Sequence, residues 1–226
     1  ASALVRYVAK QRPDRNNETY PKASAPAYAA RLILGVDTEY ALQKLDASVS
    51  SRISRAQSVW KADPKSSHAL DPFDKVALVN TYFLAKDKIP KATAAKIRDY
   101  CALYEHKVWK GYGAMNYRLM MDGAGFLAAE EWPEIRDREG LDAAGIRAAT
   151  KQRLLGYFDG ICRQNYSEYG SPIYAAVNLS ATRMLAEYAR DEDIRKRAEF
   201  TLDAMMIDIA CTWNQGLNAG PAARAK

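Results

Sequence analysis

The sequence predicts an all-α fold, an array of antiparallel helix hairpins that is either open or curved into a partial or complete (α/α) toroid. Three observations predict it. Apolar residues recur every three or four positions over long stretches. Only 12 glycines and 9 prolines interrupt the 226 residues. The connections between periodic stretches are mostly short, which makes consecutive helices antiparallel neighbours.

The chain is expected to consist of an irregular N-terminal arm, residues 1–26, and one helical-hairpin domain, residues 27–226. Residues that break regular structure are frequent in the arm. They are Pro13, Asn16, Asn17, Pro21 and Pro26. Beyond the arm no composition change marks a further boundary, so a single domain is expected.

Helices are expected where a capping residue or a proline precedes a periodic apolar stripe. The capping candidates are Asp37, Asp71, Asp142 and Ser171, and prolines open or follow at Pro72, Pro90 and Pro172. These signals predict helix pairs over 72–109, 115–166 and 171–214. The cysteines Cys101, Cys162 and Cys211 all fall in helical patterns and are expected to be buried thiols.

Composition narrows the classes of partner. Lys and Arg outnumber Asp and Glu by 33 to 27, and the net charge of +6 favours anionic partners. Nucleic acid is not expected, because the sequence has no basic run, zinc finger or base-stacking pattern. No apolar stretch approaches the ~20 residues of a membrane span. No cofactor or metal motif is present, and nothing in the sequence indicates the oligomeric state.

The first residues of the sequence give an indication of the cellular location of the protein. Small residues at positions 1–3 are compatible with cleavage by a signal peptidase, which favours a secreted or periplasmic protein. A cytoplasmic location remains an alternative.

One stretch that leads into a helix is unusually rich in polar and aromatic residues, residues 165–174. Ser171 with Pro172 is explained by helix capping, but Glu168 and Tyr174 are not. A carboxylate beside phenols at a helix N-terminus can bind sugar hydroxyls or transfer protons.

A second stretch, residues 112–118, also leads into a helix. Asn116 can cap that helix, and this is the simplest interpretation. Asn116, Tyr117 and Arg118 in succession also form a set that can neutralise a carboxylate and move a proton.

Three motifs over residues 105–226 resemble those of α/α-toroid proteins of the six-hairpin glycosidase-like and polysaccharide-lyase-like families. One is Glu-aromatic-x-Ser-Pro-x-Tyr at 168–174. Another begins at Asn116 and ends in Trp-Pro at 132–133, with Tyr117 where the families have His. The third is Ala-Gly-Pro-x-x-Arg at 219–224, where alanine replaces a second His.

The resemblance implies a carbohydrate-active protein that acts on an acidic polysaccharide, above all as a lyase that performs β-elimination. The implied catalytic residues are Asn116, Tyr117, Glu168, Tyr174 and Arg224. The implied substrate-binding residues are Arg118, Tyr169, Ser171, Asn178 and Trp213. No cofactor is implied. In this mechanism Asn116 and Arg224 neutralise a uronate carboxylate, which acidifies the adjacent C–H.

Other functions remain open at this point. A six-hairpin glycoside hydrolase would use Glu168 with a second carboxylate, for which Asp122 and Glu105 are candidates. A non-catalytic glycan-binding or helical scaffold module is favoured by the two missing histidines. A terpene-processing α/α barrel is less favoured, because the sequence has no Asp-rich metal motif.

Overall fold

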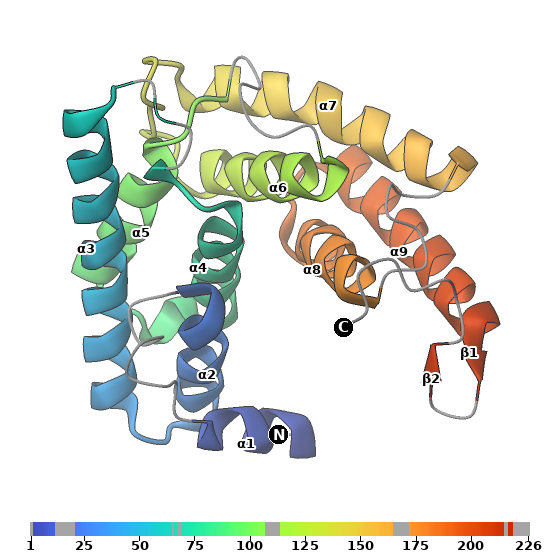
Figure 1. The fold of residues 1–226 in the computed structure, drawn as a ribbon, viewed down its shortest axis with the longest axis horizontal. Helices are drawn as coiled ribbons and strands as arrows, with labels where there is room; N and C mark the ends of the chain where they lie inside the picture. The colour runs from blue at the N-terminus through green and yellow to red at the C-terminus, as the bar shows by residue number, and fades with distance from the viewer. Residues whose placement is uncertain are drawn as a thin grey trace. The chain divides into compact units, whose positions relative to one another are not determined.

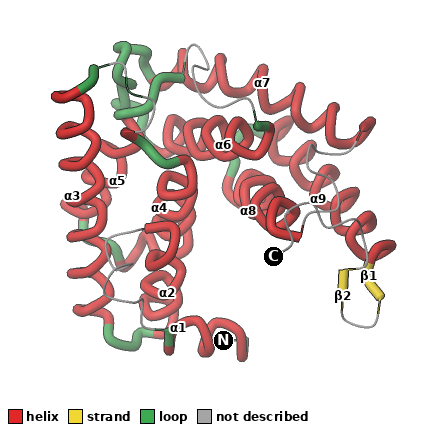
Figure 2. The backbone as a smooth tube through the Cα atoms, viewed as in Figure 1, coloured by secondary structure: helices red, strands yellow, loops and turns green. Residues whose placement is uncertain are grey.

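The computed structural model describes residues 2–11, 21–64, 66, 69–106, 114–164, 172–214 and 217–218. Regular structure in these ranges is almost entirely helical (Figure 1, Figure 2). The strands they contain are the two-residue pair β1, Trp213–Asn214, and β2, Leu217–Asn218, which are antiparallel. The predicted all-α class is therefore confirmed.

The chain divides into two compact units, each with its own buried core. Unit 1 comprises Ala1–Glu105 and Ile135–Gly140, and unit 2 comprises His106–Glu134 and Leu141–Lys226. The region expected to be one domain, 27–226, is thus shared between the two units. The candidate site residues described below all belong to unit 2.

Part of the arm predicted to be irregular is helical. Helix α1 spans Ala3–Lys10 and α2 spans Pro21–Leu34. The side chain of Ser2 caps α1, because its hydroxyl accepts a hydrogen bond from the Val5 N–H at 3.3 Å. Pro21 is the first residue of α2, where the missing N–H has no partner to lose, and Pro26 lies on the exposed side of the same helix. Prolines that favoured an irregular arm are thus compatible with helix.

Unit 1 contains α1, α2 and the helices that follow α2 as far as residue 105. Their bounds are α3 Thr38–Ala62, α4 Pro72–Ala85, the 3-10 helix η2 Lys86–Lys88, and α5 Lys91–Ala102. Helix α2 packs chiefly against α4. The N–H of Lys22 donates to Asp74 near the start of both helices, and the Lys88 ammonium donates to the Leu32 carbonyl near their ends. Helices α2 and α4 are therefore parallel.

A buried ion pair ties α3 to α4 in unit 1. Arg52 Nε lies 2.7 Å from Asp74 Oδ2, and both side chains are buried. Burial raises the pKa of Asp74, while the hydrogen bond from the Lys22 N–H and the charge of Arg52 offset part of that effect. A carboxylate so far from water depends on its partners to stay charged.

Removing one member of this pair is expected to be costly. Arg52→Met should lower the free energy of unfolding by about 3–5 kcal/mol, because Asp74 is left buried without its cation. The double variant Arg52→Met/Asp74→Asn should recover much of the loss, since Asn can still accept from the Lys22 N–H. Urea unfolding measures both.

The matched control is Arg98→Met, which removes the exposed pair with Asp99. That change should stay within about 0.5 kcal/mol of the wild type. An Arg52→Met variant as stable as Arg98→Met would contradict the importance of the buried pair.

Unit 2 consists of two packed helix hairpins. Their helices are α6 Met115–Glu131, α7 Ala143–Gln164, α8 Pro172–Tyr188, and α9 Glu192–Thr212. Helix α6 packs against α7 and α8 against α9, as expected for the predicted pairs 115–166 and 171–214. In addition α6 packs against α8, and α7 against α9. Helix α6 is buried along almost all of its length.

The three cysteines are free thiols, but only Cys101 is buried. Burial raises the pKa of the Cys101 thiol to about 11. The expectation of burial is wrong for Cys162 and Cys211, which are exposed. The buried stripe of α9 instead contains Ile194, Ala198 and Met205, and residue 211 lies outside it.

Thiol reactivity should follow this burial. In the native protein at mildly alkaline pH, an aromatic disulfide reagent should modify Cys162 and Cys211 rapidly, and Cys101 only after denaturation, because a thiol with a raised pKa and no solvent access reacts slowly. Peptide mass mapping after short exposures identifies the sites. Fast labelling of Cys101 in the native state would contradict the buried position.

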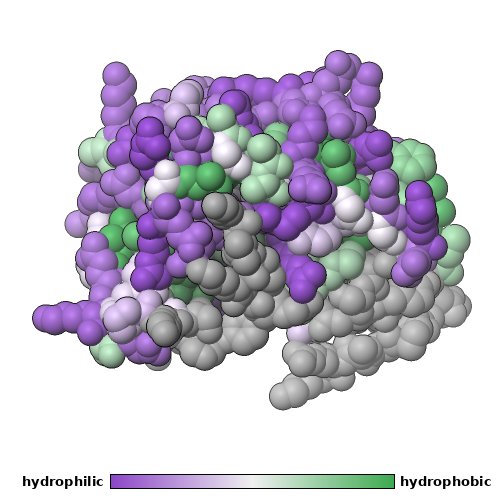
Figure 3. Space-filling view, turned by 90° about the horizontal axis from the view of Figure 1, so that it is seen from above, coloured by the Kyte–Doolittle hydropathy of each residue, from purple (hydrophilic) through white to green (hydrophobic). Residues whose placement is uncertain are grey.

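The described surface is polar on the side drawn in Figure 3, where apolar residues form small separate patches. Among the residues that the structure describes, no helix combines the length and the apolarity needed to cross a membrane.

Candidate functional site

Helices α6 and α8 are parallel, and two contacts show it. Both carboxylate oxygens of Glu130, near the end of α6, accept hydrogen bonds from the backbone N–H groups of Arg190 and Asp191, just after α8, at 2.8 and 2.9 Å. Further back, Gly123 lies against Leu185, where an added Cβ would be 3.2 Å from Cδ1 of that leucine. The N-termini of α6 and α8 therefore lie at the same end of unit 2.

This arrangement brings two asparagines into the same layer. Asn116 is two turns before Gly123 on α6, and Asn178 is two turns before Leu185 on α8. Because the helices are parallel and these two later residues touch, Asn116 and Asn178 lie on facing sides of the α6/α8 interface. We call this part of the interface, with Thr182 one turn further along α8, the amide seam.

The polar atoms of the amide seam are buried without hydrogen-bond partners. Asn116 and Asn178 are each 1% exposed, and Thr182 is fully buried. Within the described ranges the nitrogen and oxygen of both amides and the hydroxyl of Thr182 have no partner. Each such group costs about 1–3 kcal/mol. Unsatisfied groups are rare in native structures, and a cluster of them calls for partners such as ordered water, an ion or a ligand.

The opposite side of α6 carries a well-satisfied ion pair. Arg153 of α7 donates two hydrogen bonds to Asp122, at 2.9 and 2.7 Å, and a third to the His106 carbonyl at 2.7 Å. Asp122 is almost completely buried. Such bidentate, charge-assisted contacts fix both side chains and the register of α6 on α7.

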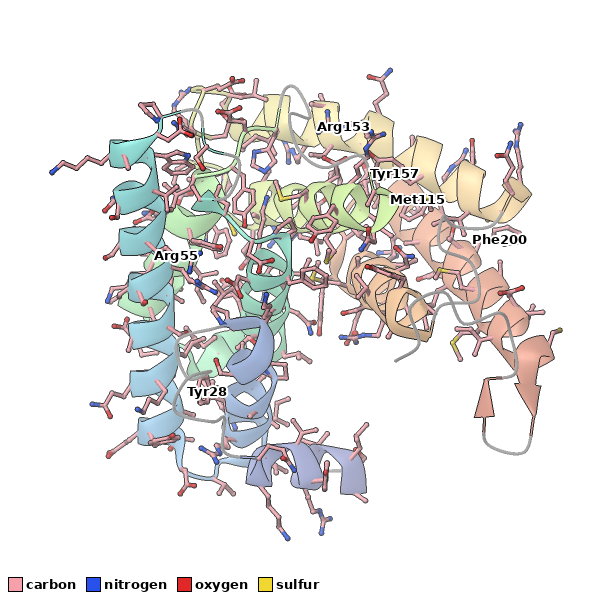
Figure 4. All side chains as sticks on the ribbon, viewed as in Figure 1. Tyr28, Arg55, Met115, Arg153, Tyr157 and Phe200 are labelled. Carbon is pink, nitrogen blue, oxygen red and sulfur yellow. The ribbon has the colours of Figure 1, made fainter. Side chains whose placement is uncertain are left out.

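One turn away, Arg118 of α6 and Tyr157 of α7 form the next layer. Figure 4 shows Arg153 and Tyr157 on α7, with Tyr157 nearer to Met115, the first residue of α6. Burial and the charge of Asp122 raise the pKa of Tyr157 to about 12, and the charge of Arg118 partly opposes them. Tyr157 is therefore neutral at physiological pH, and Arg118 lies close enough to influence it.

The structure places five of the ten predicted site residues, and all five lie in the first two turns of α6 and α8. They are Asn116, Tyr117, Arg118, Tyr174 and Asn178. The others fall outside the described residues, apart from Trp213, whose backbone begins β1 but whose side chain is not described. Those outside are Glu168, Tyr169, Ser171 and Arg224.

The capping role considered for Asn116 is wrong. Helix α6 has Ala114 at its N-cap, with no side-chain hydrogen bond, and Asn116 lies inside the helix. Its amide is thus free of the structural task that would most simply explain an asparagine at this position.

Sequence reasoning missed the role of Arg153 and Tyr157, and considered Asp122 only as a second carboxylate. A signal was available in the spacing. Arg118 and Asp122 are four residues apart, as are Arg153 and Tyr157, so each pair occupies one helix face.

Comparisons with protein-family models, curated proteins and solved structures found no match to this chain. In the part of the chain that the structure covers, no cluster of His, Cys, Asp or Glu could hold a metal ion. The interpretation of the site therefore depends on its own geometry.

The cost of the unsatisfied hydroxyl can be measured with a matched pair of substitutions. Thr182→Val should raise the free energy of unfolding by about 1 kcal/mol, because it removes a buried group that has no partner. Thr150 is equally buried on α7, but its hydroxyl donates to the Ile146 carbonyl at 2.6 Å. Thr150→Val should therefore lower stability by about 1 kcal/mol. Equal effects of the two substitutions in urea unfolding would contradict an unsatisfied Thr182.

Proposed function

We propose that this protein acts on an acidic polysaccharide by β-elimination, and that the N-terminal ends of α6 and α8 bind the uronate carboxylate. The observation that carries the proposal is the pair of buried, unsatisfied amides of Asn116 and Asn178. Amide NH₂ groups donate hydrogen bonds to carboxylates. The N-terminus of α6, where Asn116 lies, adds unpaired N–H groups and a positive dipole end beside the two amides.

The chemistry follows from neutralising the carboxylate. When its charge is held by hydrogen bonds, the adjacent C–H becomes more acidic, because the negative charge that develops on deprotonation is stabilised. A base takes that proton, the electron pair forms a C=C bond, and the C–O bond to the next sugar breaks as its oxygen is protonated. Tyr117 and Tyr174 are the candidates for proton transfer, and Glu168 and Arg224 are proposed to orient the substrate.

The arrangement of helices within each unit supports the α/α-toroid part of the proposal. In each unit a pair of parallel helices packs together, α2 with α4 and α6 with α8, and each of these helices is followed by a further helix. Repeated hairpins of this kind are the elements from which α/α toroids are built.

A non-catalytic glycan-binding function is the second candidate. Tyr117 and the alanine at 222 stand where the resembling families have histidine, and loss of proton-transfer groups leaves binding intact. The glycoside hydrolase alternative loses support, because the carboxylate of Asp122 is occupied by Arg153.

The test combines binding and turnover. The wild type is incubated with polygalacturonate, alginate and hyaluronan, and with dextran as a neutral control. Ultraviolet absorbance follows the unsaturated product. Asn116→Leu and Asn178→Leu should each lower turnover by about 100-fold, while Gln152→Leu, which removes an exposed amide on α7, should leave it unchanged.

Two outcomes would overturn the lyase proposal. If the wild type binds one of the acidic glycans but forms no unsaturated product, the glycan-binding function replaces it. If it binds none of them, the helical scaffold function does. Turnover that is unaffected by both asparagine substitutions would place the chemistry elsewhere.

A further inference from the structure

The α7 side of α6 holds two arginines, Arg118 and Arg153, whose surroundings differ. Arg118 has no ion-pair partner among the residues described here, and its Nε is buried without a hydrogen-bond acceptor. Its neighbour Arg153 differs, because Asp122 and the His106 carbonyl take up its donors. Of these two arginines, one helix turn apart in the α6/α7 interface, Arg153 is paired and Arg118 is unpaired within the described residues.

The charge of this cluster can be counted. Arg118 and Arg153 carry one positive charge each, Asp122 carries one negative charge, and Tyr157 is neutral at physiological pH. Counted over these described residues, the net charge is therefore +1, and it is located on Arg118. A guanidinium with a free edge is suited to a planar carboxylate, which it can bind through two parallel hydrogen bonds.

The Arg118 cluster and the amide seam lie on different sides of α6. Asp122, on the same face as Arg118, contacts α7, whereas Gly123, on the same face as Asn116, contacts α8. A helix with its side chains is about 10 Å across. One carboxylate cannot contact both sides, but two carboxylates of one sugar chain can when the chain crosses the start of α6.

We infer that Arg118 forms a second carboxylate subsite, so that the preferred ligand is a polyuronate carrying at least two carboxylates rather than a single uronic acid. The inference rests on the proposed function, because it needs the amide seam to bind the first carboxylate. Because the Asp122–Arg153 pair is neutral, the described residues give the second subsite the single positive charge of Arg118, which matches one carboxylate. Tyr157 lies near Arg118 and contributes no charge, because its phenol is neutral at physiological pH.

The experiment measures affinity against ligand length by calorimetry, with galacturonic acid and its oligomers as probes. Wild-type affinity should rise at least about 10-fold from the monomer to an oligomer that reaches both subsites, because the second contact is intramolecular. Arg118→Gln should remove this rise and leave monomer affinity unchanged. Arg147→Gln, which removes an exposed charge from α7, is the control for net charge and should preserve the rise.

A second pair of variants tests the charge count. Asp122→Asn raises the local charge to +2 and should strengthen oligomer binding and its dependence on salt. Asp122→Asn/Arg153→Gln restores +1 and should restore wild-type affinity. Circular dichroism and thermal unfolding check that each variant is folded.

The outcomes separate this inference from the function beneath it. If the wild type binds oligomers and Arg118→Gln binds them equally well, Arg118 is not a subsite, while the proposed function stands. The same conclusion follows if affinity does not depend on ligand length. If the wild type binds no uronate of any length, the proposed function fails and the second subsite with it.

Discussion

The carboxylate of Glu130 fixes the arrangement of unit 2. It lies at the end of α6 and accepts hydrogen bonds from two consecutive backbone N–H groups that follow α8, those of Arg190 and Asp191. A buried carboxylate with two such donors can occupy only one position. Gly123 then lets α8 approach closely, because it presents no side chain to Leu185. With these contacts fixed, the starts of α6 and α8 lie at the same end of unit 2, and Asn116 comes to face Asn178 as a consequence.

Much of the fold was predictable, because local rules decide it. The cap of Asp71 on α4 is present, with its side chain accepting from the Phe73 N–H at 2.9 Å, and the hairpins of unit 2 follow from apolar periodicity and short connections. Predictions from local sequence failed where the same residues are compatible with two different local structures. Pro21 is compatible with a loop or with a helix start. Apolar spacing places Cys162 and Cys211 in helices, but it does not say which of two adjacent stripes faces the core.

The site was predictable only in part, for a different reason. The sequence motifs identified Asn116, Arg118 and Asn178 as candidate site residues. The structure then brings the two asparagines to the α6/α8 interface. The roles of Arg153 and Tyr157 depend on the register of α7 against α6, which no local pattern encodes. Spacing of four residues shows which side chains share a face, whereas the partner helix decides whether a charge is compensated, as for Arg153, or left available, as for Arg118.

The central claim is that the amides of Asn116 and Asn178 are kept unsatisfied for an anionic sugar. The most direct measurement observes those amides themselves, by NMR of protein labelled with ¹⁵N in asparagine side chains, with assignments from the Asn116→Leu and Asn178→Leu variants. Adding polygalacturonate oligomers should shift both side-chain NH₂ signals and slow their exchange with water, whereas a neutral dextran oligomer of equal length should not. Signals of Asn116 and Asn178 that remain unchanged while the oligomer binds elsewhere would contradict the account.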